Sequence, residues 1–425
     1  MFGLALVAAF IFAYALVSRR LAKTWVTGPL LFMVFGYLVG PRALDVLNLG
    51  LDSALIQIFL EGTLVIVLFT DAAVIDYRAV RREAFLPGRL LGIGLPLTII
   101  TGILAALVFF DHLGFWQAFI IAVILAPTDA ALGQAVVTNV SVPAMVRQGL
   151  SVESGLNDGI VVPFLAIAIA GAAREMQTPA EIANVFIAEI GWAIAAGVLV
   201  GWVGARLLKL AGENGWMTRD WRLIAAPILA LLAFALADPL GGSGFIAAFV
   251  AGLVFGNQVR STYPDICEFS EGVSHLLTVV AFLVFGALIL GPSVPSMTWS
   301  MVAFAAASLT IVRMVPVAIS LIGTGLKPPT VLYIGWFGPR GLASLVFAGT
   351  VVVESDASDA PFVIAVVSVT VAMSVVAHGI SAVPLSRIYA RWFRRMDSED
   401  PLMPEAGEVD HMPSRKRLNP EIDHQ

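Results

Sequence analysis

The sequence predicts an all-α membrane protein with about thirteen transmembrane helices. Only 13% of its 425 residues are charged and the mean hydropathy is +0.90, whereas soluble globular proteins carry about 25% charged residues. The segments 90–110 and 272–312 contain no Asp, Glu, Lys or Arg, and about 20 apolar residues suffice for one helical span. These apolar runs are continuous, unlike the alternating strands of about 10 residues in a membrane barrel. A water-soluble enzyme is therefore excluded.

Charged residues and Pro/Gly breaks divide the apolar sequence into successive spans. The first run has no basic segment before it and no small-residue cleavage site after it, so we expect a retained span rather than a signal peptide. The expected spans are 2–17, 25–40, 54–75, 87–110, 115–137, 143–172, 182–205, 223–238, 243–257, 272–291, 299–323, 328–353 and 360–386.

Basic residues alternate between the two sets of connections. Connections after odd-numbered spans carry 18 of the 25 Lys and Arg residues, whereas those after even-numbered spans carry only Arg42 and Arg174. Cytoplasmic loops are enriched in Lys and Arg, so we expect the N-terminus outside the cell membrane and the C-terminus in the cytoplasm. Residues 396–425 are polar and aperiodic, which predicts a disordered cytoplasmic tail.

Composition also limits the cofactors and partners. A net charge of -5 gives no basic face for nucleic acid. The single cysteine, Cys267, excludes an internal disulfide or a CxxC site, and the five histidines are scattered. No GxxxxGK[ST] motif for ATP occurs. We expect no cofactor, with membrane lipid as the surroundings.

Charged side chains inside spans are informative because each costs about 2.5–3.5 kcal/mol at mid-bilayer on insertion scales. Glu61 and Glu189 lie near expected span ends, where a side chain can extend to the interface. The remaining six are candidates for function: Asp71, Asp129, Glu153, Asp158, Arg313 and Arg340.

The fifth span contains Ala-Pro-Thr-Asp at 126–129. Pro127 removes a backbone hydrogen bond and disfavours helix in the preceding residue. The break frees carbonyl oxygens beside Thr128 and Asp129, and such oxygens suit a small cation. Alternatively, Pro127 makes a kink and Asp129 only caps the following half-helix, although serine would cap it without a charge.

The sixth span carries four polar side chains within six residues. Ser154 and Asp158 share a helix face, as do Glu153 and Asn157, and the two pairs lie about 100° apart. They form one polar stripe that must face protein or water. Two carboxylates would serve a proton relay as well as cation passage, so composition does not separate these functions.

The twelfth span is broken by Phe-Gly-Pro-Arg-Gly at 337–341. This break comes seven spans after the first, and an odd offset reverses the orientation across the membrane. Two broken helices in inverted repeats indicate the midplane site of a secondary transporter. Arg340 can complement half-helix ends or pair with an acid such as Asp71 or Glu153, in either a functional or a structural ion pair. Arg313, in the eleventh span, fits the structural role better.

The motifs together resemble the sodium/proton exchangers of the monovalent cation:proton antiporter superfamily, in particular the prokaryotic electroneutral branch. The resemblance covers residues 1–395, and its order and span positions make it specific. It is carried by APTD at 126–129, VESGLND at 152–158, FGPRGLASLVFA at 337–348 and SVVAHGISAVPLSR at 374–387.

This resemblance implies a role for each matching residue. Na+ or Li+ would be held by Asp129, Glu153, Ser154 and Asp158, with Thr128 as a further ligand. Asn157 stands where the electrogenic branch has a second aspartate, which implies exchange of one proton per cation. Asn157, Arg340, Asp71 and Arg313 would form a supporting polar network. Asp71 is the nearest match to the acid that the family carries in its third span.

The resemblance also implies an architecture and a mechanism. The family forms homodimers, with spans 4–6 and 11–13 as a transport domain and the remaining spans as an interface domain. We expect a secondary transporter rather than an enzyme, exchanging Na+ or Li+ for H+ by alternating access. Potassium/proton exchange is the nearest alternative, because oxygen ligands alone do not separate K+ from Na+. A cation channel or ion-gated sensor using the same acids is a further one.

Overall fold

The computed structural model describes residues 2–21, 24–47, 53–75, 85–173, 179–354, 360–399 and 403–406, which form helices and no strand. Nine of these helices are long and apolar enough to cross a membrane. Together with the shorter helices α2 and α12 and with two helices broken midway, they make the thirteen spans that the sequence predicts.

The first six spans follow the expected order, and the fifth is interrupted as predicted. Their helices are α1 (Phe2–Leu21), α2 (Gly28–Val39), α3 (Ser53–Ala73), α5 (Phe85–Arg89) continuing through the π-helical η1 (Leu90–Gly94) into α6 (Leu95–Phe109), α7 (Phe115–Ile124), α8 (Ala130–Val137) and α9 (Ala144–Ala172).

The last seven spans include the second interrupted helix, α17 and α18. The helices are α10 (Pro179–Glu213), α11 (Arg219–Ala237) with η2 (Asp238–Leu240), α12 (Gly244–Val259), α13 (Pro264–Val284) with η3 (Phe285–Leu290), α14 (Gly291–Ser293) and η4 (Val294–Ser296), α15 (Trp299–Leu309), α16 (Ile311–Ser320), α17 (Pro328–Trp336), α18 (Leu342–Glu354), α19 (Ala360–Glu399) and η5 (Pro404–Ala406).

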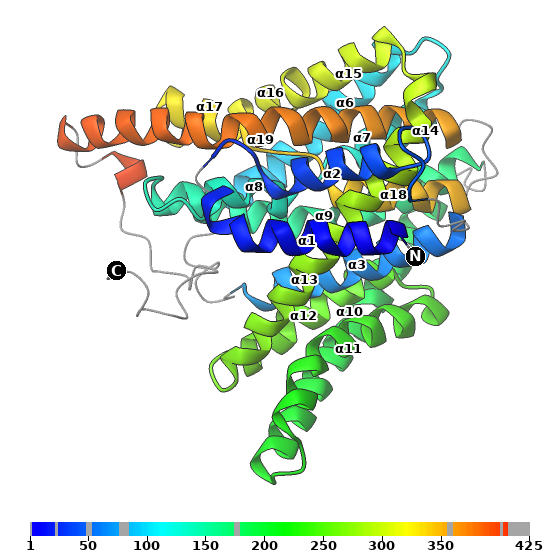
Figure 1. The fold of residues 1–425 in the computed structure, drawn as a ribbon, viewed down its shortest axis with the longest axis vertical. Helices are drawn as coiled ribbons and strands as arrows, with labels where there is room; N and C mark the ends of the chain where they lie inside the picture. Colours follow the sequence, from blue (N-terminus) through cyan, green and yellow to red (C-terminus); the bar gives the residue numbers. More distant parts are fainter. Residues whose placement is uncertain are drawn as a thin grey trace.

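Most helices run in roughly one direction, with α6 and α15 near one edge of the molecule and α10 and α11 at the other (Figure 1). On the first side α6 packs against α7, α15 and α16, and α19 packs against α15 and α18. On the second side α12 is surrounded by α3, α10 and α11. Helix α18, half of one broken helix, contacts α3 directly, and α9 contacts both α3 and the two halves of the other broken helix, α7 and α8. The broken helices therefore lie close to where the two groups meet.

Close approach of α3 and α12 depends on Gly252 and Gly256, one helical turn apart. A Cβ on Gly252 would overlap Phe69 O, and one on Gly256 would overlap Ala73 O. Small residues spaced by four let membrane helices approach backbone to backbone. This contact fixes α3 as part of the group around α12.

Part of the chain beyond the last span is ordered onto the helices. Helix α19 continues to Glu399, past the expected start of the tail at 396. Glu405 is 1% exposed and accepts hydrogen bonds from the backbone N of Lys327 at 2.7 Å and the hydroxyl of Thr330 at 2.8 Å. The rest of the expected tail, 400–402 and 407–425, lies outside the described residues.

Candidate functional site

The two broken helices meet at their breaks. Residues 125–129 separate α7 from α8, and residues 337–341 separate α17 from α18. Asp129 donates its backbone N–H to Pro339 O at 2.7 Å, so the two non-helical segments are hydrogen-bonded to each other. The two prolines, Pro127 and Pro339, therefore stand in two breaks that form one crossing.

Asp129 caps two different half-helices with one carboxylate. Its Oδ1 accepts from Leu132 N, in the first turn of α8, at 3.0 Å. Its Oδ2 accepts from Leu342 N, the first residue of α18, at 2.7 Å. A Cβ at Gly341 would overlap this carboxylate, which explains why the break ends in glycine. A negative charge at two helix N-termini is stabilised by both helix dipoles.

Arg340 complements the opposite, C-terminal end of α7. Its Nη1 donates to Ala126 O at 3.0 Å and to Pro127 O at 3.3 Å, and the side chain is 0% exposed. Ser344 donates to Ile124 O at 2.7 Å, at the same helix end. A cation near carbonyls that have no helical partner is favourable. The crossing thus has an anion at its helix N-termini and a cation at a helix C-terminus.

His378 occupies the C-terminal end of α17. Its Nε2 lies 2.9 Å from Trp336 O, and its Nδ1 lies 3.2 Å from the hydroxyl of Ser374. That hydroxyl accepts from the backbone N of Arg340 at 2.7 Å. His378 and Ser374 were not predicted as site residues, although both stand in SVVAHGISAVPLSR. Their role depends on α19 crossing behind the break, which composition does not indicate.

Glu153 and Arg313 form a bidentate ion pair. The distances are 2.6 Å for Nη1 to Oε1 and 2.8 Å for Nη2 to Oε2, and each side chain is 2% exposed. The pair joins α9 to α16, and this contact supports a structural role for Arg313. Both Glu153 oxygens are used by Arg313 in this structure.

Thr128, Ser154 and Asn157 form a short polar chain between the first break and α9. The hydroxyls of Thr128 and Ser154 lie 2.9 Å apart, and Asn157 Nδ2 donates to Thr128 Oγ1 at 2.7 Å. All three are buried. Asn157 makes no hydrogen bond with Arg340 here, so these two members of the expected network lie in different contacts.

Asp158 is the carboxylate that the crossing leaves available. It is 8% exposed, and its Oδ1 has no hydrogen-bond partner among the residues that the structure describes. A pocket between α3, α13 and the crossing is lined by Asp158, Asp129 and Asp71. The expected pairing of Arg340 with Asp71 or Glu153 is not found: Arg340 faces carbonyls, Glu153 pairs with Arg313 and Asp71 faces the pocket.

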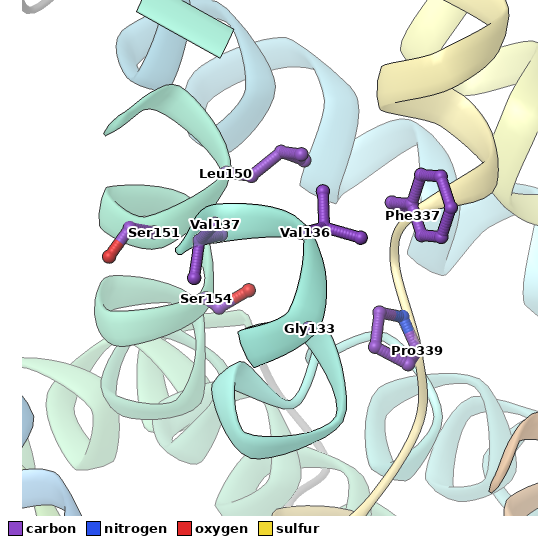
Figure 2. Close-up of a pocket in the computed structure, with 8 residues that line it drawn as sticks. All are labelled: Gly133, Val136, Val137, Leu150, Ser151, Ser154, Phe337 and Pro339. Atoms are coloured by element: carbon purple, nitrogen blue, oxygen red, sulfur yellow. The ribbon is translucent and has the colours of Figure 1, made fainter. Parts of the chain in front are cut away.

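A second, more apolar pocket lies against the other face of the crossing, between α8, α9 and the segment before α18 (Figure 2). Figure 2 shows the Ser154 hydroxyl pointing toward Pro339, whereas the Ser151 hydroxyl points away from the pocket. Ser154 therefore lines this second pocket, with Thr128 as its hydrogen-bond partner.

The site offers oxygen ligands and no transition-metal geometry. Among the described residues no group of three His, Cys, Asp or Glu is placed to hold a metal ion. Carboxylate and hydroxyl oxygens beside freed backbone carbonyls are the ligands of hard cations. Two broken helices whose ends meet at such a site are the arrangement found at the midplane sites of secondary transporters.

The chain belongs to the sodium/hydrogen exchanger family: residues 6–388 match its transmembrane region. It is a multi-pass membrane protein. Two relatives illustrate the similarity. The K(+)/H(+) antiporter NhaP of Alkalimonas amylolytica is 27% identical over 326 residues, 75% of this chain and 55% of the relative. A probable Na(+)/H(+) antiporter of Schizosaccharomyces pombe is 27% identical over 264 residues, 58% of this chain and 34% of the relative.

The chain thus spans about half the length of the curated relatives it matches, or less. The fold is that of a solved structure, the sodium proton antiporter MjNhaP1 from Methanocaldococcus jannaschii at pH 8. That likeness has a TM-score of 0.73 at 20% identity and covers 91% of this chain and 98% of the other.

Proposed function

We propose that this protein exchanges Na+ or Li+ for H+ across the membrane, with Asp158 as the group that holds either ion. The observation that carries this proposal is the distribution of partners at the crossing. Asp129 caps two half-helices and Glu153 pairs with Arg313, whereas Asp158 Oδ1 is buried and unpartnered beside a pocket. A buried carboxylate oxygen without a hydrogen-bond donor is stabilised by a proton or a bound cation.

Further cation ligands would come from the neighbouring oxygens. The hydroxyls of Thr128, in the first break, and Ser154, on α9, lie side by side. Asp129 lines the same pocket as Asp158. Glu153 would join them only after releasing Arg313, so we place it with Arg313, Arg340, Asn157 and Asp71 in the supporting set.

Coupling follows from competition for one carboxylate. A bound cation stabilises the ionised form of Asp158 and excludes the proton, and a bound proton removes the charge that attracts the cation. Moving the empty, charged site through an apolar barrier is costly, so the site crosses only when loaded. Asn157 contributes no second charge, so one cation exchanges for one proton and the cycle moves no net charge.

The proposal extends to the location, the assembly and the moving domain of the protein. We place the protein in the cell membrane as a homodimer, with the N-terminus outside and the C-terminus in the cytoplasm. The transport domain would comprise spans 4–6 and 11–13, moving against the rest. A K+/H+ antiporter is the second candidate, because a relative from Alkalimonas amylolytica carries that name.

The test is dissipation of a preset pH gradient in proteoliposomes after addition of Na+, Li+ or K+. Wild type and Asp158→Asn are compared, with Glu189→Gln as a matched control, since Glu189 lies in α10 away from the crossing. We expect a saturable response to Na+ and Li+ that Asp158→Asn abolishes and Glu189→Gln retains.

Each other outcome changes the proposal in a defined way. Exchange retained by Asp158→Asn refutes the assignment of the central residue. A response to K+ alone keeps an antiporter and replaces its substrate. Proton flux that needs no counter-ion gradient replaces the exchanger with a conductance.

A further inference from the structure

One face of α3 carries polar side chains at both of its ends and leucines between them. Gln57, Leu64 and Asp71 are spaced by seven residues and therefore share a helix face, with Glu61 one turn from Gln57. Leu60, Leu64 and Leu68 are at most 2% exposed. This α3 face packs against α18, so it lies along the boundary between the two groups of helices.

The Asp71 end of this face lines the pocket that holds Asp158. The pocket is bounded on α3 by Leu64, Val67, Thr70 and Asp71, and it reaches no residue of α3 before Leu64. On α18 it reaches only Leu342 and Ala343, the first two residues of that half-helix. The pocket that holds Asp158 therefore lies at the Asp71 end of the α3 face and not at the Gln57 end.

The Gln57 end is closed against a later part of α18. Gln57 Nε2 donates to Glu61 Oε1 and lies 3.5 Å from Thr350 Oγ1. A Cβ on Gly349 would overlap the Gln57 amide, so this side chain lies directly on the α18 backbone. Gln57 is only 8% exposed. This contact, between Gln57, Glu61 and the Gly349–Thr350 pair, is called the α3–α18 latch below.

An apolar layer separates the latch from the pocket. Phe347, one turn of α18 before Thr350, is 0% exposed and contacts the Phe245 ring with centroids 6.0 Å apart. Leu64, at the near edge of the pocket, is 1% exposed. Between Glu61 and Asp71 this face of α3 therefore carries buried leucines, Leu64 and Leu68.

Glu61 needs an explanation of its own. It is the ninth residue of α3, well inside the helix, so extension of its side chain to the interface does not account for it. It is partly buried, and within the described part of the chain no Lys, Arg or His forms an ion pair with it. A carboxylate inside a membrane span is costly without a cationic partner, and the Gln57 amide supplies a hydrogen bond but no positive charge. A passing cation would supply that partner.

We propose that Gln57 and Glu61 form the cation entrance on the face of the membrane opposite to Asp71, closed in this structure by the α3–α18 latch. This inference rests on the proposed exchange. When α18 moves along α3, the latch opens and the pocket at Asp71 closes, so Glu61 attracts the cation at one face and Asp71 at the other. Gln57 holds the Glu61 carboxylate in place while the entrance is shut.

The test measures Na+ dependence separately at the two faces, in everted and in right-side-out membrane vesicles. Glu61→Gln is compared with Asp71→Asn, with Glu61→Asp as a charge-preserving variant and Glu189→Gln as a control. Charge-lined clefts raise local cation concentration by about tenfold or more. We expect Glu61→Gln to raise the half-saturating Na+ concentration about tenfold at one face only, and Asp71→Asn to do so at the other.

The outcomes separate this inference from the function on which it rests. Wild-type vesicles without Na+-dependent proton movement refute both. Exchange in wild type with an equal effect of Glu61→Gln at both faces, or none, refutes the entrance alone. If Glu61→Gln fails to insert, Thr350→Val decides: loss of the latch should shift Na+ dependence at the Glu61 face, and an unchanged value at that face overturns the proposal.

Discussion

Asp129 and Asp158, 29 positions apart in the sequence, have opposite surroundings at the crossing. Asp129 uses both carboxylate oxygens on backbone N–H groups of α8 and α18, whereas Asp158 Oδ1 has no partner. The sequence leaves two interpretations of Asp129, a helix cap or a cation ligand. In this structure it is a cap for two helices at once, and it also lines the pocket. A cation near Asp158 would therefore meet a carboxylate that is already held in place.

Replacing Asp129 should reduce stability more than replacing Asp158. Each lost cap costs about 0.5–2 kcal/mol, and Asp129→Ala removes two. Asp129→Ser should recover most of the α8 cap, because serine is a good N-cap, but not the contact with Leu342 N. Thermal unfolding in detergent checks the order wild type, Asp129→Ser, Asp129→Ala. An Asp158→Ala protein as unstable as Asp129→Ala would contradict the division of roles.

The Glu153–Arg313 pair should show strong non-additivity. Breaking a buried pair from one side costs about 3–5 kcal/mol, because the remaining charge is uncompensated. Glu153→Gln and Arg313→Met should each lower the unfolding temperature strongly. The double variant should lose less stability than the sum of the two single losses. Thermal melts of all four proteins form the cycle. Additive losses would mean that the two side chains do not act as a pair.

At the scale of elements, four half-helices end within one crossing, and their exposed backbone groups need partners. The α8 and α18 N-termini share Asp129, the α7 C-terminus has Arg340 and Ser344, and the α17 C-terminus has His378. Unpaired backbone groups in hydrocarbon cost several kcal/mol each. These partners let two interrupted helices persist at the middle of the protein.

Arg340 should be replaceable only by another cation. Arg340→Met leaves Ala126 O and Pro127 O without a donor, at about 1–3 kcal/mol for each unsatisfied group. Arg340→Lys keeps the charge and three N–H donors on one flexible ammonium group, so it should restore part of the stability and some transport. Unfolding temperature and Na+-driven proton flux are measured together. If Lys and Met variants behave alike, Arg340 contributes volume rather than charge.

The sequence predicts the elements better than their contacts. Pro127 and the Phe-Gly-Pro-Arg-Gly run place both breaks correctly, because proline and glycine act on the local backbone. The choice of partner depends on the tertiary structure. The sequence allows either Asp71 or Glu153 to pair with Arg340, yet in the structure Arg340 donates to backbone carbonyls. The capping role of His378 depends in the same way on how α19 crosses the break, and the proximity of Gln57 to Thr350 joins residues 293 positions apart.

At the scale of the whole molecule, the site lies between a group of helices held around α12 and a group that contains both broken helices. Glycines bring α3 and α12 into backbone contact, which makes α3 part of the first group. Of the broken helices, α17–α18 contacts α3 directly through α18. The other, α7–α8, packs against α9, which in turn contacts α3. The pocket at Asp158 is formed by side chains from both groups, among them Asp71, Ser274 and Thr278 on one side and Asp129 and Leu342 on the other. Relative motion of the groups would therefore change access to Asp158 without disturbing the contacts that hold the crossing together.

One carboxylate shared by two ions predicts a specific dependence on pH. Where the proton occupies Asp158, each unit drop in pH should raise the half-saturating Na+ concentration by up to about tenfold, since the ions compete for the same group. At high pH the cation saturates the site and release of Na+ in exchange for a proton becomes limiting, so the maximal rate should fall. Initial rates of Na+-driven proton flux over a grid of pH and Na+ measure both effects. Because the proposed cycle moves no net charge, currents on a solid-supported membrane should show no sustained component at any pH. A maximal rate that falls as the pH is lowered at saturating Na+, or a sustained Na+-driven current, would require a second titrating group in the transport cycle.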